Sequence, residues 1–240
     1  NLYQYPVHLK LNTGMNRLGF TDVNFTELIK ILSTTSLIQI ASIFSHLATS
    51  DMPNEDAFTL QQITTFKNWS DQLKQKLNIS PILHILNTSG IYNFSEYQMD
   101  MVRIGIGLYG VGNNENENAQ LHNVATLKTI ILQINNIDTG ESVGYGRRFK
   151  ANAKKQIATI PIGYADGIRR SYGNGKGSVL INGMKAPIVG SVCMDMLMAD
   201  VTNCNTKIGD EVIIFGNDLR ITEVAKIWDT IPYEVIVFSH

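Results

Sequence analysis

The chain has 240 residues, of which 44% are hydrophobic, so it is long enough to bury a sizeable core in one large or two small domains. Lys and Arg (20) nearly balance Asp and Glu (21), and the net charge of -1 argues against a nucleic-acid partner or an anionic membrane surface. The 2 cysteines are too few for a disulfide framework and are not spaced as in a structural zinc site, so we expect no metal and a cytoplasmic location.

Residues 5–112 alternate short β-rich stretches with amphipathic helical stretches, a pattern typical of parallel βα units. The chain contains no internal repeat and no Gly-rich nucleotide-binding fingerprint. We therefore expect a parallel sheet with helical crossovers. The expected strands are residues 6–11, 37–44, 82–86 and 101–109.

Two amphipathic segments between these strands predict helices. The first has Asn24 as its expected N-cap, with Glu27 three residues further on. The second begins near Asn54, and Asn78 and Pro81 close it. The residues expected on the buried faces are Phe25, Leu28, Ile29 and Leu32 in the first helix and Ile63, Phe66, Ser70, Leu73 and Leu77 in the second.

A polar, acidic stretch at residues 113–119 is expected to be a mobile loop at the boundary between two domains, residues 1–113 and 114–240. Beyond it, β-rich runs are separated by turn signals, so the second domain is expected to be mainly β. The turn signals are Asp138-Thr139-Gly140, the Asn182-Gly183 hairpin and Gly209-Asp210, and a short helix is expected at residues 221–228.

The first domain carries polar and glycine-rich positions where its expected strands end. In a βα barrel, the residues that follow each strand project into the mouth of the active site. Taken singly, each position has an ordinary explanation, such as a surface ion pair for Arg17 or a buried, satisfied histidine for His46. The positions are Lys10, Arg17, His46, residues 87–90 and residues 103–107.

These positions lie in a series of motifs that continues into the second half of the chain: HLKLNTGMNRLGF, IFSHLATSD, HILNTSG, MVRIGIGLYG, VGYGRRF, IPIGYADGIRR and APIVGSVCMDM. Together the motifs resemble the alanine racemases, fold-type III enzymes that use pyridoxal 5'-phosphate, and the resemblance spans residues 8–235. It implies the latter strands of a (β/α)8 TIM-type barrel followed by a mainly β C-terminal domain. It also implies interconversion of L- and D-alanine for cell-wall peptidoglycan, in a homodimer with shared active sites.

The resemblance implies cofactor contacts in the first domain. Arg103 is similar to the arginine that donates to the pyridine nitrogen, and His46 to the histidine that bridges this arginine to a catalytic tyrosine. Because an arginine does not give up its proton, the ring nitrogen stays largely unprotonated, which limits transamination and other side reactions. Arg17 resembles the arginine at the phenolic oxygen, and Lys10 aligns with a lysine whose carbamylated form positions that arginine. The remaining expected cofactor-binding residues are His84, Thr88, Gly105 and Ile106.

The resemblance also implies contacts from the second domain. Tyr145 matches the catalytic tyrosine that acts across the dimer interface, although a tyrosine there has an ordinary explanation as a sheet-edge aromatic. Racemisation needs acid/base groups on opposite faces of the substrate Cα, and a tyrosine is one of them in the family. The expected substrate-binding residues are Met194, Arg17, Tyr164 and Asp195, with Asp166 beside Tyr164 at the substrate entrance.

The resemblance breaks at both ends. No segment matches V-K-A-x-A-Y-G, the motif whose lysine binds the cofactor covalently and is the other base. A full barrel takes about 250 residues, so we expect an N-terminally truncated barrel and an inactive chain. The ending Phe238-Ser239-His240 departs from the family, which indicates a truncated or frame-shifted end. The parent protein is either a stand-alone racemase or the racemase part of a fusion with a cell-wall ligase.

Two other functions stay open at this point. A fold-type III decarboxylase of basic amino acids would need a carboxylate at the pyridine nitrogen and a catalytic cysteine near the C-terminus, which Arg103 and the Tyr145 motif argue against. A non-catalytic dimerisation fragment fits the missing lysine. The upstream coding sequence would discriminate between them, since an open frame with the lysine motif joining Asn1 favours the enzyme.

Overall fold

A computed structural model describes residues 4–238, and these residues fall into two compact units. Unit 1 runs up to Leu108 and includes Gly112–Leu121, and unit 2 comprises Tyr109–Val111 and the residues from His122 onward. The expectations for Asn1 and for the ending Ser239-His240 lie outside the described residues.

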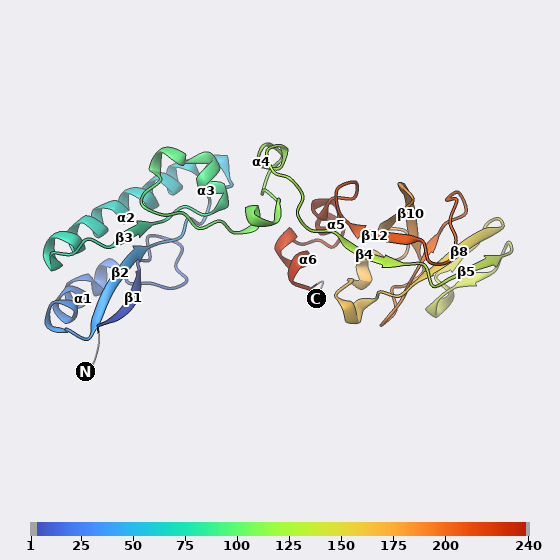
Figure 1. Cartoon of the computed structure of the whole chain (residues 1–240), viewed down its shortest axis with the longest axis horizontal. Helices are drawn as coiled ribbons and strands as arrows, with labels where there is room; N and C mark the ends of the chain where they lie inside the picture. The colour runs from blue at the N-terminus through green and yellow to red at the C-terminus, as the bar shows by residue number, and fades with distance from the viewer. Residues whose placement is uncertain (1–3, 239–240) are drawn as a thin grey trace. The chain divides into compact units, whose positions relative to one another are not determined.

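The framework of unit 1 is a parallel sheet with strand order β1-β2-β3. Strands β1 (Tyr5–Lys10), β2 (Ile38–Phe44) and β3 (Ile82–His84) are joined by the helices α1 (Asp22–Thr34) and α2 (Asp56–Leu77), as Figure 1 shows. Parallel strands with helical crossovers confirm the predicted partial barrel. The other elements are the 3-10 helices η1 (Pro53–Glu55), η2 (Ser95–Tyr97) and η3 (Ile106–Tyr109) and the helices α3 (Thr88–Asn93) and α4 (Glu115–Ala119).

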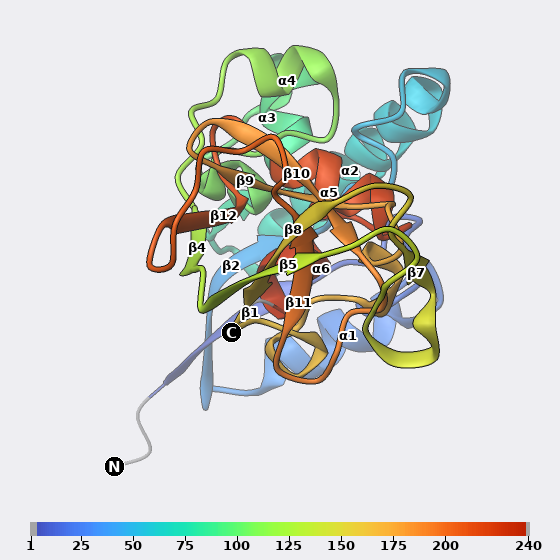
Figure 2. The same cartoon turned by 90° about the vertical axis from the view of Figure 1, so that its right-hand side faces the viewer.

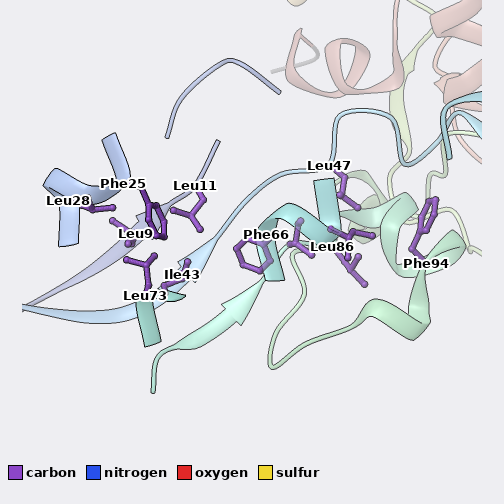
Figure 3. Packing of buried hydrophobic residues seen from close by; sticks show 12 residues of the cluster. Leu9, Leu11, Phe25, Leu28, Ile43, Leu47, Phe66, Leu73, Leu86 and Phe94 are labelled. Carbon is purple, nitrogen blue, oxygen red and sulfur yellow. The ribbon is translucent and has the colours of Figure 1, made fainter. Parts of the chain in front are cut away.

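The core of unit 1 lies between the sheet and the apolar faces of its two long helices (Figure 3). Phe25 and Leu28 are the buried residues of α1, while Phe66 and Leu73 of α2 are fully buried, so the predicted faces of both helices are confirmed. Full burial of each such side chain contributes about 1.5–3 kcal/mol. This packing holds the carboxyl ends of the strands in place.

The predicted N-cap of the first helix is wrong, whereas the predicted C-terminal end of the second helix is confirmed. Helix α1 begins at Asp22 after Thr21, whose extended backbone makes it the N-cap, while Asn24 lies inside the helix and accepts a hydrogen bond from Thr21 Oγ1 at 3.0 Å. Helix α2 ends at Asn78, which adopts a left-handed conformation with φ of 50° and donates its N–H to Lys74 O.

The expected strand at residues 101–109 is wrong. The N–H groups of Gly105 and Gly107 donate to Thr88 Oγ1 at 2.9 and 3.3 Å, which removes them from any sheet ladder. The chain then turns into the 3-10 helix η3. A side-chain hydroxyl that offers the backbone an alternative acceptor explains why the alternating pattern failed here.

The expected mobile loop at residues 113–119 is also wrong, because the segment contains the capped helix α4. Asn114 accepts the N–H of Glu117 through its side chain at 2.9 Å. The carboxylate of Glu117 is buried and accepts the N–H of Asn113 at 2.8 Å. The carboxylate of Glu117 therefore forms local hydrogen bonds that order this stretch. The boundary between residues 113 and 114 stays a prediction.

Unit 2 is built on a 7-stranded antiparallel sheet with the order β4-β12-β9-β10-β11-β8-β5, which confirms the mainly β prediction. The neighbouring strands β11, β8 and β5 are seen side by side in Figure 2. The strands are β4 (Leu127–Ile130), β5 (Gln133–Ile137), β8 (Lys155–Ile160), β9 (Ser178–Ile181), β10 (Met184–Val189), β11 (Leu197–Asp200) and β12 (Glu211–Phe215), with β6 (Ser142–Val143) and β7 (Phe149–Lys150) in a separate pair.

The Asn182-Gly183 hairpin between β9 and β10 is confirmed, since both residues have positive φ, of 50° and 77°, as a tight hairpin turn requires. The predicted late helix is α5 (Ile221–Ile227), and α6 (Pro232–Phe238) was not predicted. The short 3-10 helices of unit 2 are η4 (Tyr145–Arg147), η5 (Tyr164–Asp166) and η6 (Arg170–Tyr172).

Candidate active site

Arg103 is the centre of a polar cluster at the carboxyl ends of β2 and β3. Its Nη1 donates to His84 Nδ1 at 2.5 Å, and its Nη2 donates to Ser45 O at 2.5 Å and lies 3.3 Å from His46 Nδ1. A further contact joins Nη2 to Ile85 O at 3.4 Å. Because these acceptors fix both Nη atoms, the guanidinium has one orientation, and its Nε has no partner among the described residues.

The contacts of Arg103 set the proton positions on the two histidines. A guanidinium only donates hydrogen bonds, so both Nδ1 atoms must be unprotonated acceptors, and each neutral ring carries its proton on Nε2. Burial, then Arg103 and His8, lower the pKa of His84 to about 4. Burial, then Arg103, Arg17 and Lys10, lower the pKa of His46. Both rings are therefore neutral at pH 7.

Lys10 and Arg17 add further positive charge to this cluster. Burial, then the charges of Arg17 and Arg103, lower the pKa of Lys10, so both arginines lie within electrostatic reach of Lys10. Lys10 Nζ and Arg103 Cζ lie 5.8 and 5.3 Å from the centre of the Phe44 ring. Among the described residues, no carboxylate forms an ion pair with any of these three cations. We call Lys10, Arg17 and Arg103 the cation cluster.

Thr88 supplies a hydroxyl group at the start of α3. Its Oγ1 accepts the N–H groups of Gly105 and Gly107, so its own proton is available to a further acceptor. The side chain is buried, and a Cβ added to Gly107 would lie 2.8 Å from Thr88 Cγ2, so the backbone approaches this close only because residue 107 is glycine. Ile106 is buried between the two glycines.

In unit 2, the predicted substrate-binding residues lie on two segments that are joined by backbone hydrogen bonds. The N–H of Tyr164 donates to Cys193 O and that of Ala165 to Met194 O, each at 2.9 Å. Gly163 packs so closely that an added Cβ would lie 2.2 Å from Met194 O. Tyr164, Met194 and Asp195 are exposed at this junction.

Asp166 has a local structural contact, since its carboxylate accepts the N–H of Gly163 at 2.9 Å. Tyr145 is 76% exposed at the rim of a groove of about 550 Å³ that is also lined by Val143, Cys193 and Met198. The groove brings Tyr145 and Cys193 to one face of unit 2. Its lining is mostly apolar and includes the Tyr145 side chain.

The predicted residues thus form two groups, one in each unit. The cofactor residues Lys10, Arg17, His46, His84, Thr88, Arg103, Gly105 and Ile106 belong to unit 1, and Tyr145, Tyr164, Met194 and Asp195 belong to unit 2. The sequence did not indicate Phe44 and Ser42, which contact the first group from β2. The only available signal was the alternation of strand residues, which places both on one face.

Two family models match this chain. Residues 2–113 match the alanine racemase N-terminal domain, and residues 124–239 match the alanine racemase C-terminal domain. The chain belongs to the alanine racemase family. This assignment confirms the resemblance carried by the motifs and favours it over the decarboxylase alternative.

Named relatives and solved structures agree with the family. The chain is 40% identical to alanine racemase 1 of Clostridium acetobutylicum, covering 96% of the chain and 61% of the relative, and 38% identical to an alanine racemase of Halothermothrix orenii, covering 96% and 62%. It resembles the Bartonella henselae alanine racemase structure, described as having covalently bound pyridoxal phosphate, with a TM-score of 0.83, 32% identity and coverage of 97% and 64%. The chain therefore spans about 62% of the length of its curated relatives.

None of the helices in the described residues is long and apolar enough to cross a membrane. The same residues contain no group of three or more His, Cys, Asp or Glu side chains arranged to hold a metal ion.

Proposed function

We propose that the protein carrying this segment is an alanine racemase, which interconverts L- and D-alanine with pyridoxal 5'-phosphate and supplies D-alanine for the cell wall. The single observation that supports it most is Arg103, a donor-only side chain held by His84, His46 and backbone carbonyls, where a decarboxylase would carry a carboxylate. Membership of the alanine racemase family and the names of the relatives point the same way.

The residues of unit 1 fit pyridoxal phosphate. The cation cluster gathers three positive groups without a paired carboxylate, an arrangement that costs free energy until an anionic ligand balances it. The Thr88 hydroxyl has a proton to donate to a phosphate oxygen, and the glycine-rich backbone beside it allows close approach of such a group. Arg103 Nε–H is available to a ring nitrogen. The cofactor would then be held at both ends.

In the proposed reaction, the bound cofactor provides an electron-withdrawing ring that stabilises negative charge at the substrate Cα. Arg103 donates a hydrogen bond to the ring nitrogen and keeps its own proton, because a guanidinium stays protonated even where burial lowers its pKa. Arg17 binds the phenolic oxygen, with Lys10 beside it. His84 and His46 accept from Arg103 and hold its orientation.

Unit 2 provides the substrate side of the proposal. Tyr145 moves a proton at one face of the substrate Cα through its phenol oxygen, and the Met194 N–H binds the substrate carboxylate. Tyr164 and Asp195 line the approach to them. We further propose a homodimer in which Tyr145 of one copy serves the cofactor site of its partner, in the cytoplasm. These roles rest on the matching motifs.

The proposal is tested with a full-length racemase that carries this segment. We expect it to form D-alanine from L-alanine when pyridoxal phosphate is present, and Tyr145→Phe to abolish most of the turnover. Serine and lysine serve as comparison substrates. Absence of turnover with alanine and with both other amino acids would contradict the proposed function, and release of carbon dioxide from lysine would favour the decarboxylase.

Residues 1–240 expressed alone provide the complementary test. Because these residues contain no V-K-A-x-A-Y-G motif, we expect the polypeptide to be inactive and to bind the cofactor without a covalent bond. Borohydride treatment followed by mass spectrometry detects covalent attachment. If the cofactor were trapped on a lysine and D-alanine were formed, a lysine within these 240 residues would replace the one in the family motif.

A further inference from the structure

A hydrogen-bonded chain runs from Arg103 across all three strands of unit 1 to the first strand. Arg103 Nη1 donates to His84 Nδ1 at 2.5 Å, His84 Nε2 lies 3.0 Å from Ser42 Oγ, and Ser42 Oγ lies 2.6 Å from His8 Nδ1. Ser42 is 1% and His84 4% exposed, whereas His8 is exposed. The chain therefore connects a partly buried guanidinium to β1 through two buried side chains.

The direction of the hydrogen bonds follows from Arg103. Since a guanidinium has no acceptor, His84 Nδ1 must be unprotonated and His84 Nε2 must carry the proton. That N–H then donates to Ser42 Oγ, and the single Ser42 proton is free to go to His8 Nδ1. If Ser42 instead donated to His84 Nε2, the proton of His84 would sit on Nδ1 and face the N–H of Arg103.

The register of the sheet brings His8 and Ser42 together. Val7 pairs with Ile40, but His8 pairs with Ser42, so β2 contains one extra residue, Ala41, at this point. Such bulges re-aim side chains and are common beside active sites. Without the extra residue, His8 would lie opposite Ala41, which has no polar group. A backbone irregularity is therefore present where the hydrogen-bonded chain needs it.

We propose that Ser42 and His8 are positioning residues for Arg103, which act by fixing the protonated nitrogen of His84. The proposal rests on the proposed function, in which Arg103 holds the cofactor. Barrel interiors are usually filled by bulky aliphatic side chains. Polar Ser42 and His84 in such a position need a hydrogen-bonding role, and within residues 4–238 their side-chain hydrogen bonds lead only to Arg103 and His8. The lowered pKa of His84 agrees, since the chain needs a neutral ring.

Histidine-selective ¹⁵N spectroscopy of the full-length racemase tests the proposal, with the His84 signals assigned through His84→Gln. The unaltered protein should show His84 neutral, with the proton on Nε2 only. Ser42→Ala removes the acceptor of the Nε2 proton and leaves Arg103 alone to hold the ring, so part of the population should lose the Arg103–His84 hydrogen bond and carry the proton on Nδ1. Ser42→Thr, which keeps the hydroxyl, should restore the single form. Ser70→Ala is the matched control, because Ser70 is equally buried in unit 1 and its Oγ has no partner among the described residues.

A second variant keeps the test valid if Ser42→Ala does not fold. His8→Leu removes the ring nitrogen that accepts from Ser42, frees the Ser42 proton and should likewise populate the form of His84 protonated on Nδ1. Racemisation should fall about tenfold in Ser42→Ala, the size expected for loss of an outer hydrogen bond that orients a site. A proton on Nδ1 in the unaltered protein, or a His84 spectrum unchanged in both variants, would overturn the proposal. Failure of the proposed function would appear separately, as an unaltered protein without turnover.

Discussion

The two units differ in whether their positively charged side chains are paired with carboxylates. In unit 2, several cationic side chains are paired with carboxylates, among them Lys155–Asp200 at 2.8 Å, Lys185–Glu223 at 2.7 Å and Lys128–Glu211 at 3.0 Å. In the described part of unit 1, the cation cluster has no such partner, and the one ion pair there joins Lys74 to Asp71 on the surface of α2. Charges balanced within the protein stabilise the fold, whereas unbalanced charges held together indicate a site for an anion.

Because of this difference, removing a positive charge should have different effects in the two units. Removing a cation from unit 1 should change ligand binding and turnover more than the free energy of unfolding. Removing one from unit 2 should do the reverse, in proportion to how far its ion pair is buried. The following variants test each side of the comparison.

The largest effect is expected for Arg103→Glu in the full-length racemase. A carboxylate there removes the donor to the ring nitrogen and the contacts to His84 and His46, so racemisation should slow on the order of 100-fold. Transamination products should appear, because the ring nitrogen can then be protonated. Product analysis by chiral chromatography measures both. The control is Lys76→Glu, the same charge change at an exposed position of unit 1, and equal losses in the two variants would contradict the account.

The next effect is expected at Thr88. Thr88→Ala removes the hydroxyl that accepts Gly105 N–H and Gly107 N–H and that we assign to the phosphate, so affinity for pyridoxal phosphate should fall about tenfold. Thr88→Ser keeps the hydroxyl and should bind nearly as the parent does. Fluorescence titration gives the dissociation constants, and an equal loss in both variants would mean that the methyl group and its packing matter instead.

In unit 2, Lys155→Met should lower the free energy of unfolding by about 2 kcal/mol, because it leaves the carboxylate of Asp200 with few partners in a partly buried position. The matched control is its neighbour Lys154, whose pair with Asp138 is 3.5 Å long and exposed, so Lys154→Met should change little. Urea unfolding measures both. Racemisation at 25 °C should be unaffected in each variant.

The same pair predicts how stability depends on pH. Burial acts to raise the pKa of Asp200, but hydrogen bonds from Lys155 and Thr202 outweigh it and hold the pKa below its usual value. The ionised carboxylate therefore stabilises the fold above the pKa of the unfolded chain, and this contribution is lost as the pH falls through the lowered value. Melting temperatures of the parent and of Asp200→Asn should converge in acid. A constant difference between them would show that this ionisation is not linked to folding.

The smallest effect is expected for Lys128→Met. Its ion pair with Glu211 joins two half-exposed side chains, with 52% and 54% exposure, and such pairs contribute about 0.2–1 kcal/mol. Urea unfolding in low and high salt should differ only slightly between parent and variant. A larger loss would mean that the aliphatic stem of Lys128, which lies on β4, contributes packing.

Elements with a strong local signal could be predicted from the sequence. The faces of α1 and α2 followed from helical spacing, and the hairpin from Asn182-Gly183. The conformation of residues 101–109 could not be predicted from the local pattern, because N–H groups that a strand would donate to its neighbour donate to the distant Thr88 hydroxyl instead. Likewise, the acidic segment at residues 113–119 is ordered by the buried Glu117.

The candidate site shows the same limit. The sequence motifs indicated the main residues of the site. The residues that contact them could not be predicted, because these contacts depend on how the strands pair. Ser42 lies opposite His8 because of the irregular pairing between β1 and β2, and it reaches His84 through the pairing of β2 with β3. Phe44 stacks on His84 with ring centres 5.2 Å apart. No local pattern in the sequence indicates either contact, since both join residues that lie far apart along the chain.

The most direct test of the account is a calorimetric titration of pyridoxal phosphate into the full-length protein with its cofactor-attaching lysine replaced, so that binding is reversible. The account predicts that Arg103→Glu weakens binding on the order of 100-fold, that pyridoxal without the phosphate binds more weakly than the phosphate ester, and that Lys155→Met has no effect. Equal affinity in the parent, Arg103→Glu and Lys155→Met would contradict the claim that the cation cluster of unit 1 is balanced by this cofactor.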